Sequence, residues 1–293
     1  MKIIRSHEYI DLPDTVTASG FTISMLPDFH NGDHEEILRL VGEDAPDIIM
    51  IPGDVILGYL PDGCDRVIDK CANVIPFLEG CAEIAPTYMS LGNHECLLTD
   101  DELEKIRKTG VTLLDNEWCE TFMPGGDQSP ENRLLIGGLT SAFVLSYRSF
   151  RDQVNRDNDG EQVRYPSRRP PRSIGRFPSE SSWLDGFTSE EGYRILLCHH
   201  PEYWSMRDPM IIDRKIDLVL SGHAHGGQWR IFGRGIYSPG QGLFPRFTSG
   251  IHRGPFGNMV VSRGLHNPYA AVPRFGNPCE IVYIHLQGQS GPQ

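Results

Sequence analysis

Histidine and carboxylate side chains recur in this sequence directly after short apolar runs, and their types suit metal binding. The segment Ser221–Gly227 carries His223 and His225, and it follows the apolar run 216–220. Neutral imidazole is the commonest metal ligand in proteins. If the chain stays extended there, the two histidines point the same way, because side chains alternate along a strand. The pair predicts a metal site at the end of a buried strand, whereas a loop with two solvated histidines is the alternative.

Four other apolar runs end in residues of the same kinds. They supply two carboxylates, one amide and further imidazoles: Asp28 and His30 after 20–26, Asp54 after 48–51, Asn93 and His94 after 87–91, and His199 after 194–198. One divalent ion rarely takes so many ligands, but two ions that share a carboxylate use them readily. Oxygen and imidazole ligands without thiolate favour manganese, iron or zinc over calcium or copper(I). The set therefore predicts two divalent metal ions.

The apolar runs alternate with segments of helical periodicity, and this alternation indicates how the fold positions the ligands. Alternating strands and helices are typical of α/β proteins, in which ligands gather beyond the carboxyl ends of the strands. We expect helices from Asp33 to about 45, from about 65 to 83, and from about 100 to 109 after a capping box of Thr99 and Glu102. Further strands are expected at 111–114, 118–122 and 134–139, and late strands at 259–262 and 280–284 are expected in a second sheet.

Composition and charge narrow the class of protein. The net charge of -12 argues against a general nucleic-acid-binding surface, which is usually basic. No apolar run approaches the ~20 residues that span a bilayer, and the first residues lack the apolar core of a signal peptide. We therefore expect a cytoplasmic protein without a transmembrane segment. Seven cysteines with no C-x-x-C pair predict reduced thiols and no cysteine zinc site.

Residues 1–293 are expected to form a single domain that carries a loop insertion at about 146–182. Apolar periodicity stops in this segment, and eight arginines accumulate around four prolines. Such a composition cannot build a core of its own. The loop is either a surface insertion or a lid whose guanidinium groups bind an anionic substrate through their bidentate geometry.

Taken in order, the motifs resemble those of the calcineurin-like metallophosphoesterase superfamily. The matching blocks are Asp28-Phe29-His30, Gly53-Asp54, Gly92-Asn93-His94-Glu95, His199 and Gly222-His223-Ala224-His225. The segments 226–228, 238–242 and 261–265 resemble more narrowly its bacterial YaeI/YkuE-like phosphodiesterase branch. The resemblance covers about residues 20–285 apart from the arginine-rich loop. It implies an α/β fold that is a four-layer sandwich of two mixed β-sheets flanked by helices, with the metal site at one edge.

The resemblance also implies a role for each site residue. One metal would be held by Asp28, His30, Asp54 and His225, and the other by Asp54, Asn93, His199 and His223, with Asp54 as the bridge. His94 would face the substrate, where it would stabilise phosphoryl oxygens or protonate the leaving oxygen. Glu95 would orient His94. We expect His252 and Arg253, in a glycine-rich segment, as further candidates for substrate binding.

These residues predict a metal-dependent phosphoric ester hydrolase that acts on a phosphorylated small-molecule or nucleotide-type substrate. A hydroxide bridging the two metals would attack phosphorus in line while the cations neutralise the phosphoryl oxygens. The branch resemblance favours a phosphodiesterase or pyrophosphatase over a monoesterase. A non-catalytic metal-binding scaffold on the same fold is one alternative, although such proteins usually lack a ligand or the catalytic histidine. A nuclease is the other, and the acidic balance counts against it.

Overall fold

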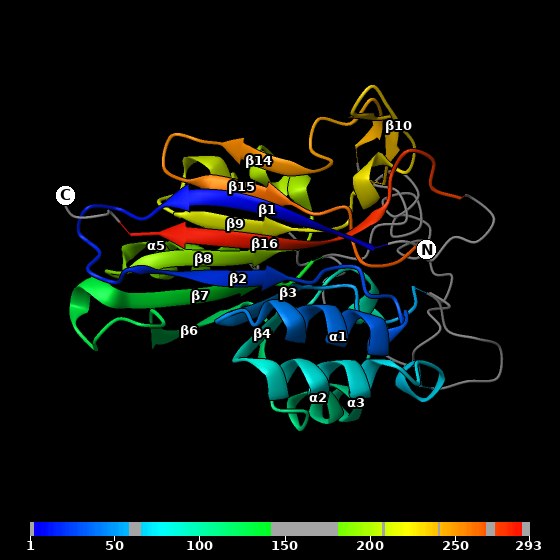
Figure 1. Cartoon of the computed structure of the whole chain (residues 1–293), viewed down its shortest axis with the longest axis horizontal. Coiled ribbons are helices and arrows are strands. Elements are labelled where there is room, and N and C mark those ends of the chain that lie inside the picture. The colour runs from blue at the N-terminus through cyan, green and yellow to red at the C-terminus, as the bar shows by residue number, and fades with distance from the viewer. Residues whose placement is uncertain are drawn as a thin grey trace, which may run out of the picture.

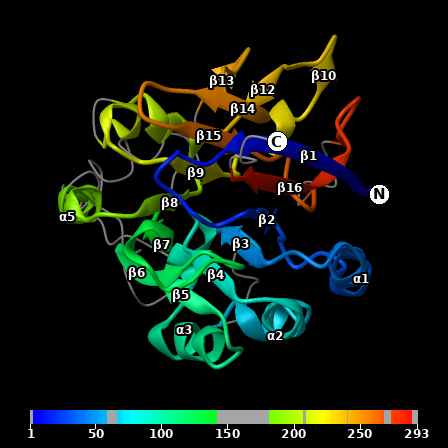
Figure 2. The same ribbon diagram turned by 60° about the vertical axis from the view of Figure 1, so that its left-hand side comes forward.

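The fold is built on two mixed β-sheets of six strands each, which lie face to face (Figures 1 and 2). The computed structural model describes residues 3–58, 66–141, 181–206, 209–239, 241–267 and 273–288. The arginine-rich loop expected at about 146–182 lies outside the described residues, apart from its last two.

The first sheet carries three of the motif-bearing strands side by side. Its order is β1 (Ile3–Asp11), β16 (Cys279–Gln287), β2 (Gly20–Met25), β3 (Ile48–Pro52), β4 (Thr87–Ser90) and β5 (Thr112–Leu114). Strands β2 to β5 are parallel, whereas β16 runs antiparallel to β2. Because parallel strands end at the same edge, the loops after β2, β3 and β4 come together there.

The second sheet repeats this arrangement for the later motifs. Its order is β14 (Gly250–Arg253), β15 (Asn258–Val261), β9 (Leu218–Ser221), β8 (Tyr193–Cys198), β7 (Arg133–Leu139) and β6 (Glu117–Phe122). Strands β15, β9, β8 and β7 are parallel, and β14 and β6 are antiparallel edges. The loops after β8 and β9 therefore also share one edge.

Helices cover the outer faces of the two sheets. α1 (His34–Asp44), α2 (Val74–Ile84) and α3 (Asp100–Arg107) pack on the first sheet, and α5 (Trp183–Ser189) packs on the second (Figure 1). The core between the sheets consists of apolar side chains from both, including Ile23, Met50, Ile195 and Leu220. The predicted four-layer sandwich is confirmed. Among the described residues, no helix is long and apolar enough to cross a membrane.

Two helix starts follow from local hydrogen bonds that the sequence predicts. The side chain of Asp33 accepts from the amide of Glu35 at the start of α1, at 3.1 Å. At the start of α3, the Glu102 amide donates to Thr99 Oγ1 and the Thr99 amide donates to the Glu102 carboxylate, at 3.4 and 2.9 Å. These bonds satisfy backbone donors that have no partner within the helix. The predicted capping box is confirmed.

The structure differs from the sequence predictions at three elements. The single helix expected from about 65 to 83 is divided into a short 3-10 turn at Ile68–Lys70 and helix α2, which begins at Val74. Helix α2 cannot begin much earlier, because Pro76 is tolerated only in the first turn of a helix. The strand at 280–284 belongs to the first sheet, where β16 lies between β1 and β2, so its placement in a second sheet is wrong. Strand β1 is not apparent from the sequence, because this edge strand is mostly polar.

Candidate metal centre

The predicted metal-binding residues meet where the carboxyl edges of the two sheets adjoin. Asp28, Asp54 and Asn93 come from loops of the first sheet, and His199 and the two later histidines come from loops of the second. Backbone hydrogen bonds join the loops, including Asp28 N to Gly53 O at 3.2 Å. The amide of His223 donates to the carboxylate of Asp28 at 3.1 Å, which fastens one sheet to the other at the site.

Several candidate ligands lie in the left-handed region of backbone space: φ is 57° at Asp28, 45° at His30, 57° at Asp54, 62° at His223 and 45° at His225. Positive φ is uncommon for residues other than glycine, and such strain gathers at functional sites. The expectation that the last two histidines share a direction because the strand continues is wrong. Strand β9 ends at Ser221, and turns rather than strand alternation aim these rings.

The side chains form overlapping groups whose nitrogen and oxygen atoms lie within 4.8 Å of one another. Three of the groups are Asp28, His30 and His225; His30, Asp54 and His94; and Asp54, His199 and His223; a fourth is His200, Glu202 and His223. Asp28 Oδ1 lies 3.6 Å from His30 Nε2 and 3.8 Å from His225 Nε2. Asp54 Oδ2 lies 3.0 Å from His199 Nε2 and 3.6 Å from His94 Nε2. Each aspartate therefore lies in the middle of its own set of imidazoles, and His30 belongs to two groups.

Hydrogen bonds to backbone carbonyls fix two of these rings in the tautomer that metal binding needs. His30 Nδ1 donates to the carbonyl of Ile56 at 3.1 Å, and His199 Nδ1 donates to the carbonyl of Pro52 at 2.7 Å. In its neutral form each ring then presents Nε2 without a proton toward the aspartates; His199 reaches this form only by giving up a proton, because the neighbouring carboxylates raise its pKa to about 10. This is the usual outer support of a metal-bound histidine.

Buried polar atoms that lack hydrogen-bond partners also favour metal binding at this site. His30 Nε2 and the side-chain oxygen of Asn93 are buried and have no hydrogen-bond partner among the described residues. Burying a polar atom without a partner costs about 1–3 kcal/mol, and a metal ion would remove this cost. Oxygen and neutral nitrogen atoms in such proximity fit a pair of divalent ions.

Burial and mutual charge shift the pKa values of these groups in opposite directions. Burial alone would raise the pKa of Asp28 and of Asp54, but the surrounding histidines hold both pKa values below their ordinary range. Burial lowers the pKa of His94 to about 4 and that of His225 to about 3. His199 is the exception, because Asp54 and Asp28 outweigh its burial and raise its pKa to about 10. The site thus combines charged carboxylates with mostly neutral imidazoles.

Glu95 supports the loops rather than the ring of His94. Its buried carboxylate accepts hydrogen bonds from the backbone amides of Asp54, Val55 and Gly92, at 2.7 to 2.8 Å. His94 is instead oriented by the carbonyl of Ile56, 3.3 Å from Nδ1. We expected Glu95 to orient His94; among the described residues no hydrogen bond joins this carboxylate to the His94 ring, and it instead satisfies backbone amides of the tight turns.

Two residues near the site were not singled out from the sequence. Arg274 donates from Nη2 to His225 Nδ1 at 3.0 Å and to the carbonyl of His266 at 2.8 Å, while its Nε and Nη1 are buried and have no hydrogen-bond partner within the described ranges. Because arginine only donates, the proton of a neutral His225 then lies on Nε2, which faces Asp28. His225 can bind metal through Nε2 only once that proton has left or moved to Nδ1.

Glu202 is the second residue that was missed. Its Oε1 lies 3.8 Å from His223 Nε2, and burial raises the pKa of this carboxyl to about 7. The position of Glu202, three residues after His199, is the sequence signal that could have found it. Arg274 gives no such signal, because 48 residues separate it from His225 along the chain.

The two residues expected to bind substrate lie on a strand rather than in a loop. His252 and Arg253 belong to β14, where Arg253 pairs with Asn258 at the start of β15. The start of β15 is the end of the sheet opposite to the metal ligands, so the prediction that Arg253 lines the site is wrong. His252 packs edge-on against Phe247, with ring centroids 5.0 Å apart.

Comparison with known proteins gives one family and several distant relatives. The sequence profile of the calcineurin-like phosphoesterase family matches residues 21–227. A transmembrane protein with metallophosphoesterase domain from Danio rerio is 25% identical over 94% of this chain and 55% of its own length. The phosphodiesterase YaeI of Escherichia coli is 24% identical over 73% of this chain and 64% of its own. This chain thus spans less than two thirds of either relative.

A solved structure of a dimetal phosphatase from Danio rerio is also similar. It is 13% identical in sequence, covers 83% of this chain and 87% of its own, and superimposes with a TM-score of 0.45.

Proposed function

The chain belongs to the calcineurin-like phosphoesterase family, and we propose that it is a hydrolase that cleaves a phosphoester with two divalent metal ions. The observation that carries this proposal is the convergence of Asp28, Asp54 and four histidines at one buried edge. We further propose a phosphodiester or pyrophosphate substrate rather than a monoester. The name of the relative YaeI, a phosphodiesterase, supports this choice.

The grouping of the side chains supports a division of ligands between two ions. Asp28, His30 and His225 would hold one ion, and Asn93, His199 and His223 would hold the other, with Asp54 between them. Manganese, iron or zinc suits such oxygen and nitrogen ligands. Bound there, the ions would supply an activated water and neutralise charge on the phosphoryl oxygens.

His94 is the residue that we propose to act on the substrate. With Nδ1 donating to Ile56, the ring presents Nε2 on the side of Asp54, 3.6 Å from Oδ2. Once the ring carries a second proton, Nε2 is the atom that would donate to a phosphoryl oxygen or give a proton to the leaving oxygen. A Cβ at Gly58 would come within 2.5 Å of the His94 ring, so the glycine leaves the ring its place.

Arg274 is positioned to bind the anionic substrate beside His225. Two of its guanidinium nitrogens have no partner in the part of the chain that the structure describes and lie next to the candidate metal-binding groups, and arginine stays charged at any working pH. A guanidinium fork binds phosphate oxygens in a bidentate manner. We propose that Arg274 holds a non-bridging oxygen of the substrate.

The test is a hydrolysis screen of the purified chain with manganese, iron(II), zinc or magnesium. Its substrates are an aryl phosphodiester, an aryl phosphomonoester and a nucleoside pyrophosphate. Asp54→Asn should lose both metal content and activity, whereas His94→Ala should keep its metal and lose about 10²–10⁴-fold in rate. His7→Ala, an exposed histidine on β1, is the control and should change neither.

Two outcomes would contradict the proposal. A wild-type chain that binds metal but cleaves none of these substrates would favour a metal-binding scaffold. Full activity in His94→Ala would remove the proposed role of that ring.

A further inference from the structure

A unit of two short β-hairpins follows the His225 loop and extends from the sandwich. We call residues 229–239 and 241–249 the hairpin unit. Its strands are β10 (Arg230–Ile231), β11 (Arg234–Gly235), β12 (Tyr237–Ser238) and β13 (Gly242–Leu243). β10, β12 and β13 lie at the top in Figure 2. Ile236 joins the two hairpins, because its amide donates to the carbonyl of Trp229 at 2.9 Å and its carbonyl accepts from the amide of Phe244 at 2.8 Å.

Large apolar side chains of this unit are exposed to solvent instead of packing in the core. Most of the exposed large hydrophobic side chains among the described residues belong to it or lie beside it: Trp229, Ile231, Phe232, Tyr237, Leu243, Phe244 and the neighbouring Phe275. Phe232 is 101% exposed and Phe244 is 77% exposed. Exposed apolar groups gathered in one place usually mark an interaction surface.

The two phenylalanines are held out by strained backbone. Phe232 and Phe244 have φ values of 50° and 54°, which are rare for a bulky side chain. Such conformations persist where the surroundings impose them, and they cluster at functional positions. The β10–β11 turn and the segment directly after β13 therefore present one aromatic ring each to solvent, instead of the polar or glycine residues that suit these conformations.

The charge around these rings is opposite to that of the whole protein. Between Asp217 and Glu280 the sequence contains six arginines and no aspartate, glutamate or lysine, although the chain has a net charge of -12. Three of these arginines, at 230, 234 and 246, belong to the hairpin unit. Among the described residues, no carboxylate lies within 4.0 Å of any of the three. The unit is therefore a cationic surface with uncompensated charge.

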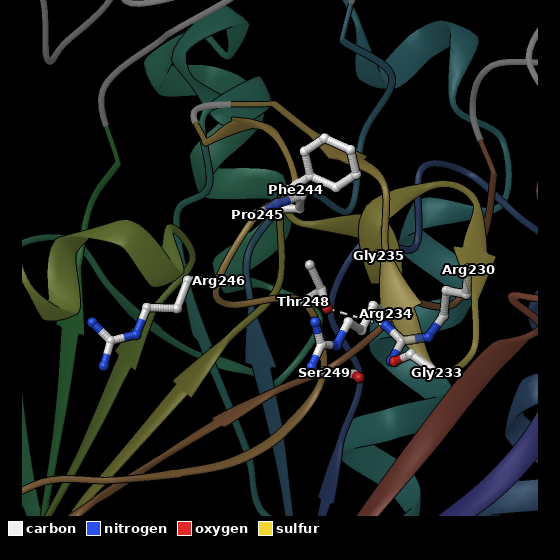
Figure 3. A pocket seen from close by; sticks show the side chains of 9 residues that line it. All are labelled: Arg230, Gly233, Arg234, Gly235, Phe244, Pro245, Arg246, Thr248 and Ser249. Atoms are coloured by element: carbon white, nitrogen blue, oxygen red, sulfur yellow. Dashed lines mark hydrogen bonds between the residues drawn. The ribbon is translucent and has the colours of Figure 1, made fainter.

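A cavity of about 500 Å³ in this unit offers several hydrogen-bond donors. Arg230, Arg234, Thr248 and Ser249 line it below Phe244, as Figure 3 shows. Arg230 is anchored by its bonds to Thr248 Oγ1 at 3.1 Å and to the carbonyl of Gly226 at 2.9 Å. Guanidinium and hydroxyl donors grouped in this way match the oxygens of a phosphate group.

We propose that the hairpin unit docks on an anionic lipid surface. Phe232 and Phe244 would enter the boundary between headgroups and acyl chains, where aromatic rings are favoured. The exposed Arg234 and Arg246 would contact the lipid phosphates, with the charge of the anchored Arg230 behind them, because cationic side chains near an anionic leaflet add to its attraction. The combination of apolar insertion with basic charge is what stable surface binding requires. An uncharged protein partner would explain the exposed rings. It would not explain why the surrounding segment contains arginines but no acidic residue.

The docked orientation would also place the metal centre close to the membrane. Gly226, whose carbonyl Arg230 holds, directly follows His225. The inference itself does not depend on hydrolysis, since it concerns binding alone and can be tested without any substrate.

The test is co-sedimentation of the full chain with vesicles at low and high salt. Vesicles of phosphatidylcholine with one third phosphatidylglycerol are compared with vesicles of phosphatidylcholine alone. We expect binding to the anionic vesicles that is at least tenfold tighter than to the neutral ones and that weakens as salt is raised. Free glycerol phosphate, as a competitor, separates a lipid surface from a soluble phosphate ligand and should displace little protein.

Matched variants locate the surface. A Phe232→Ser, Phe244→Ser double variant and an Arg234→Gln, Arg246→Gln double variant should each bind at least tenfold more weakly. Phe256→Ser changes an equally hydrophobic residue, 50% exposed, that precedes β15 at the opposite end of the sheet, and it should bind like wild type. Arg107→Gln on α3 is the control for charge. Thermal unfolding of every variant verifies that it is folded.

Three results would overturn the proposal: no binding of wild type to anionic vesicles at low salt, equal binding to both vesicle types, or equal losses in the control variants. A concentration-dependent dimer that the phenylalanine variants abolish would also overturn it, since the surface would then join two copies of the chain.

Discussion

At the scale of single residues, the site depends on groups that keep buried charge in place. Asp28 and Asp54 are buried among histidines, of which His199 carries the raised pKa, and backbone carbonyls set the tautomers of His30 and His199. Arg274 adds a permanent positive charge at the rim of this set. A change at any of these residues therefore acts on charge balance more than on packing.

Arg274→Gln should lower kcat/KM for an anionic substrate by about ten- to a hundredfold. The loss of one charge-assisted hydrogen bond, worth about 1.5–3 kcal/mol, sets this range. Steady-state kinetics with metal analysis provides the measurement, and Arg39→Gln on α1, which is exposed and pairs with Glu43, is the control. Unchanged kcat/KM in Arg274→Gln would show that Arg274 does not touch the substrate.

His200→Phe should reduce the amount by which the free energy of unfolding falls as the pH is lowered. Burial, assisted by the charge of His199, lowers the pKa of His200 to about 3. Between about pH 6.5 and pH 3 the unfolded chain binds a proton at His200 that the folded chain does not, so stability rises with pH in this window. From pH 7 to pH 5, the wild type should lose about 2 kcal/mol more than the variant.

Urea unfolding of the chelator-treated proteins at the two pH values measures this difference. The new ring can stack on Tyr203, as His200 does with centroids 4.8 Å apart. A packing penalty from the substitution would lower the free energy of unfolding equally at both pH values. Only the difference between the two pH values therefore reports on His200. Identical pH dependence in the two proteins would contradict the buried neutral state of His200.

At the scale of elements, the candidate ligands follow the ends of parallel strands, and tight loops orient their side chains. The loops come so close that glycine is required where they meet. Gly264 has φ of 80°, and a Cβ there would lie 2.7 Å from the Cβ of Asp28. Gly242, in the hairpin unit, has a similar φ of 76° but has nothing within 4 Å of such a Cβ. The two positions thus share backbone strain and differ in what surrounds them.

Gly264→Ala should lower metal affinity and hydrolysis at least tenfold, whereas Gly242→Ala should leave both unchanged. Each variant should lose about 1–2 kcal/mol of stability from the left-handed backbone alone. Metal titration, activity and urea unfolding separate the two effects. Equal loss of metal binding in both variants would show that strain, and not the contact with Asp28, governs the site.

At the scale of the whole molecule, the candidate ligands tie the two sheets together. Asp28, Asp54 and Asn93 follow strands of the first sheet, whereas His199 and His223 follow strands of the second. The sheets also share one apolar core. We therefore propose that residues 1–293 fold as a single domain whose stability is coupled to metal binding.

Removal of metal by a chelator should lower the unfolding temperature. A ligand at one hundred times its dissociation constant adds about 2.7 kcal/mol per site, and each kcal/mol shifts the midpoint by about 2–4 °C in chains of roughly this size. Thermal unfolding with manganese and with a chelator measures the shift. The Asp54→Asn protein should show a much smaller shift, and an equal shift in both proteins would contradict coupling through this site.

The sequence alone determined the types of the candidate ligands, their order and the strands that carry them. Apolar runs that end in Asp, Asn and His were sufficient, since buried parallel strands have a strong local pattern and their ends share an edge. The capping box at Thr99 was equally local. The polar edge strand β1 and the first-sheet position of β16 were not predictable in this way, because strand order depends on pairing between segments far apart in the chain.

Only the tertiary structure decided how the side chains are aimed and what supports them. The left-handed turns at His223 and His225, the amide bonds of Glu95 and the approach of Arg274 all arise from loops that meet across two sheets. No spacing encodes such contacts, since they depend on the relative placement of distant elements. The sequence could name the candidate metal ligands, but their grouping around Asp28 and Asp54 follows from how the two sheets pack.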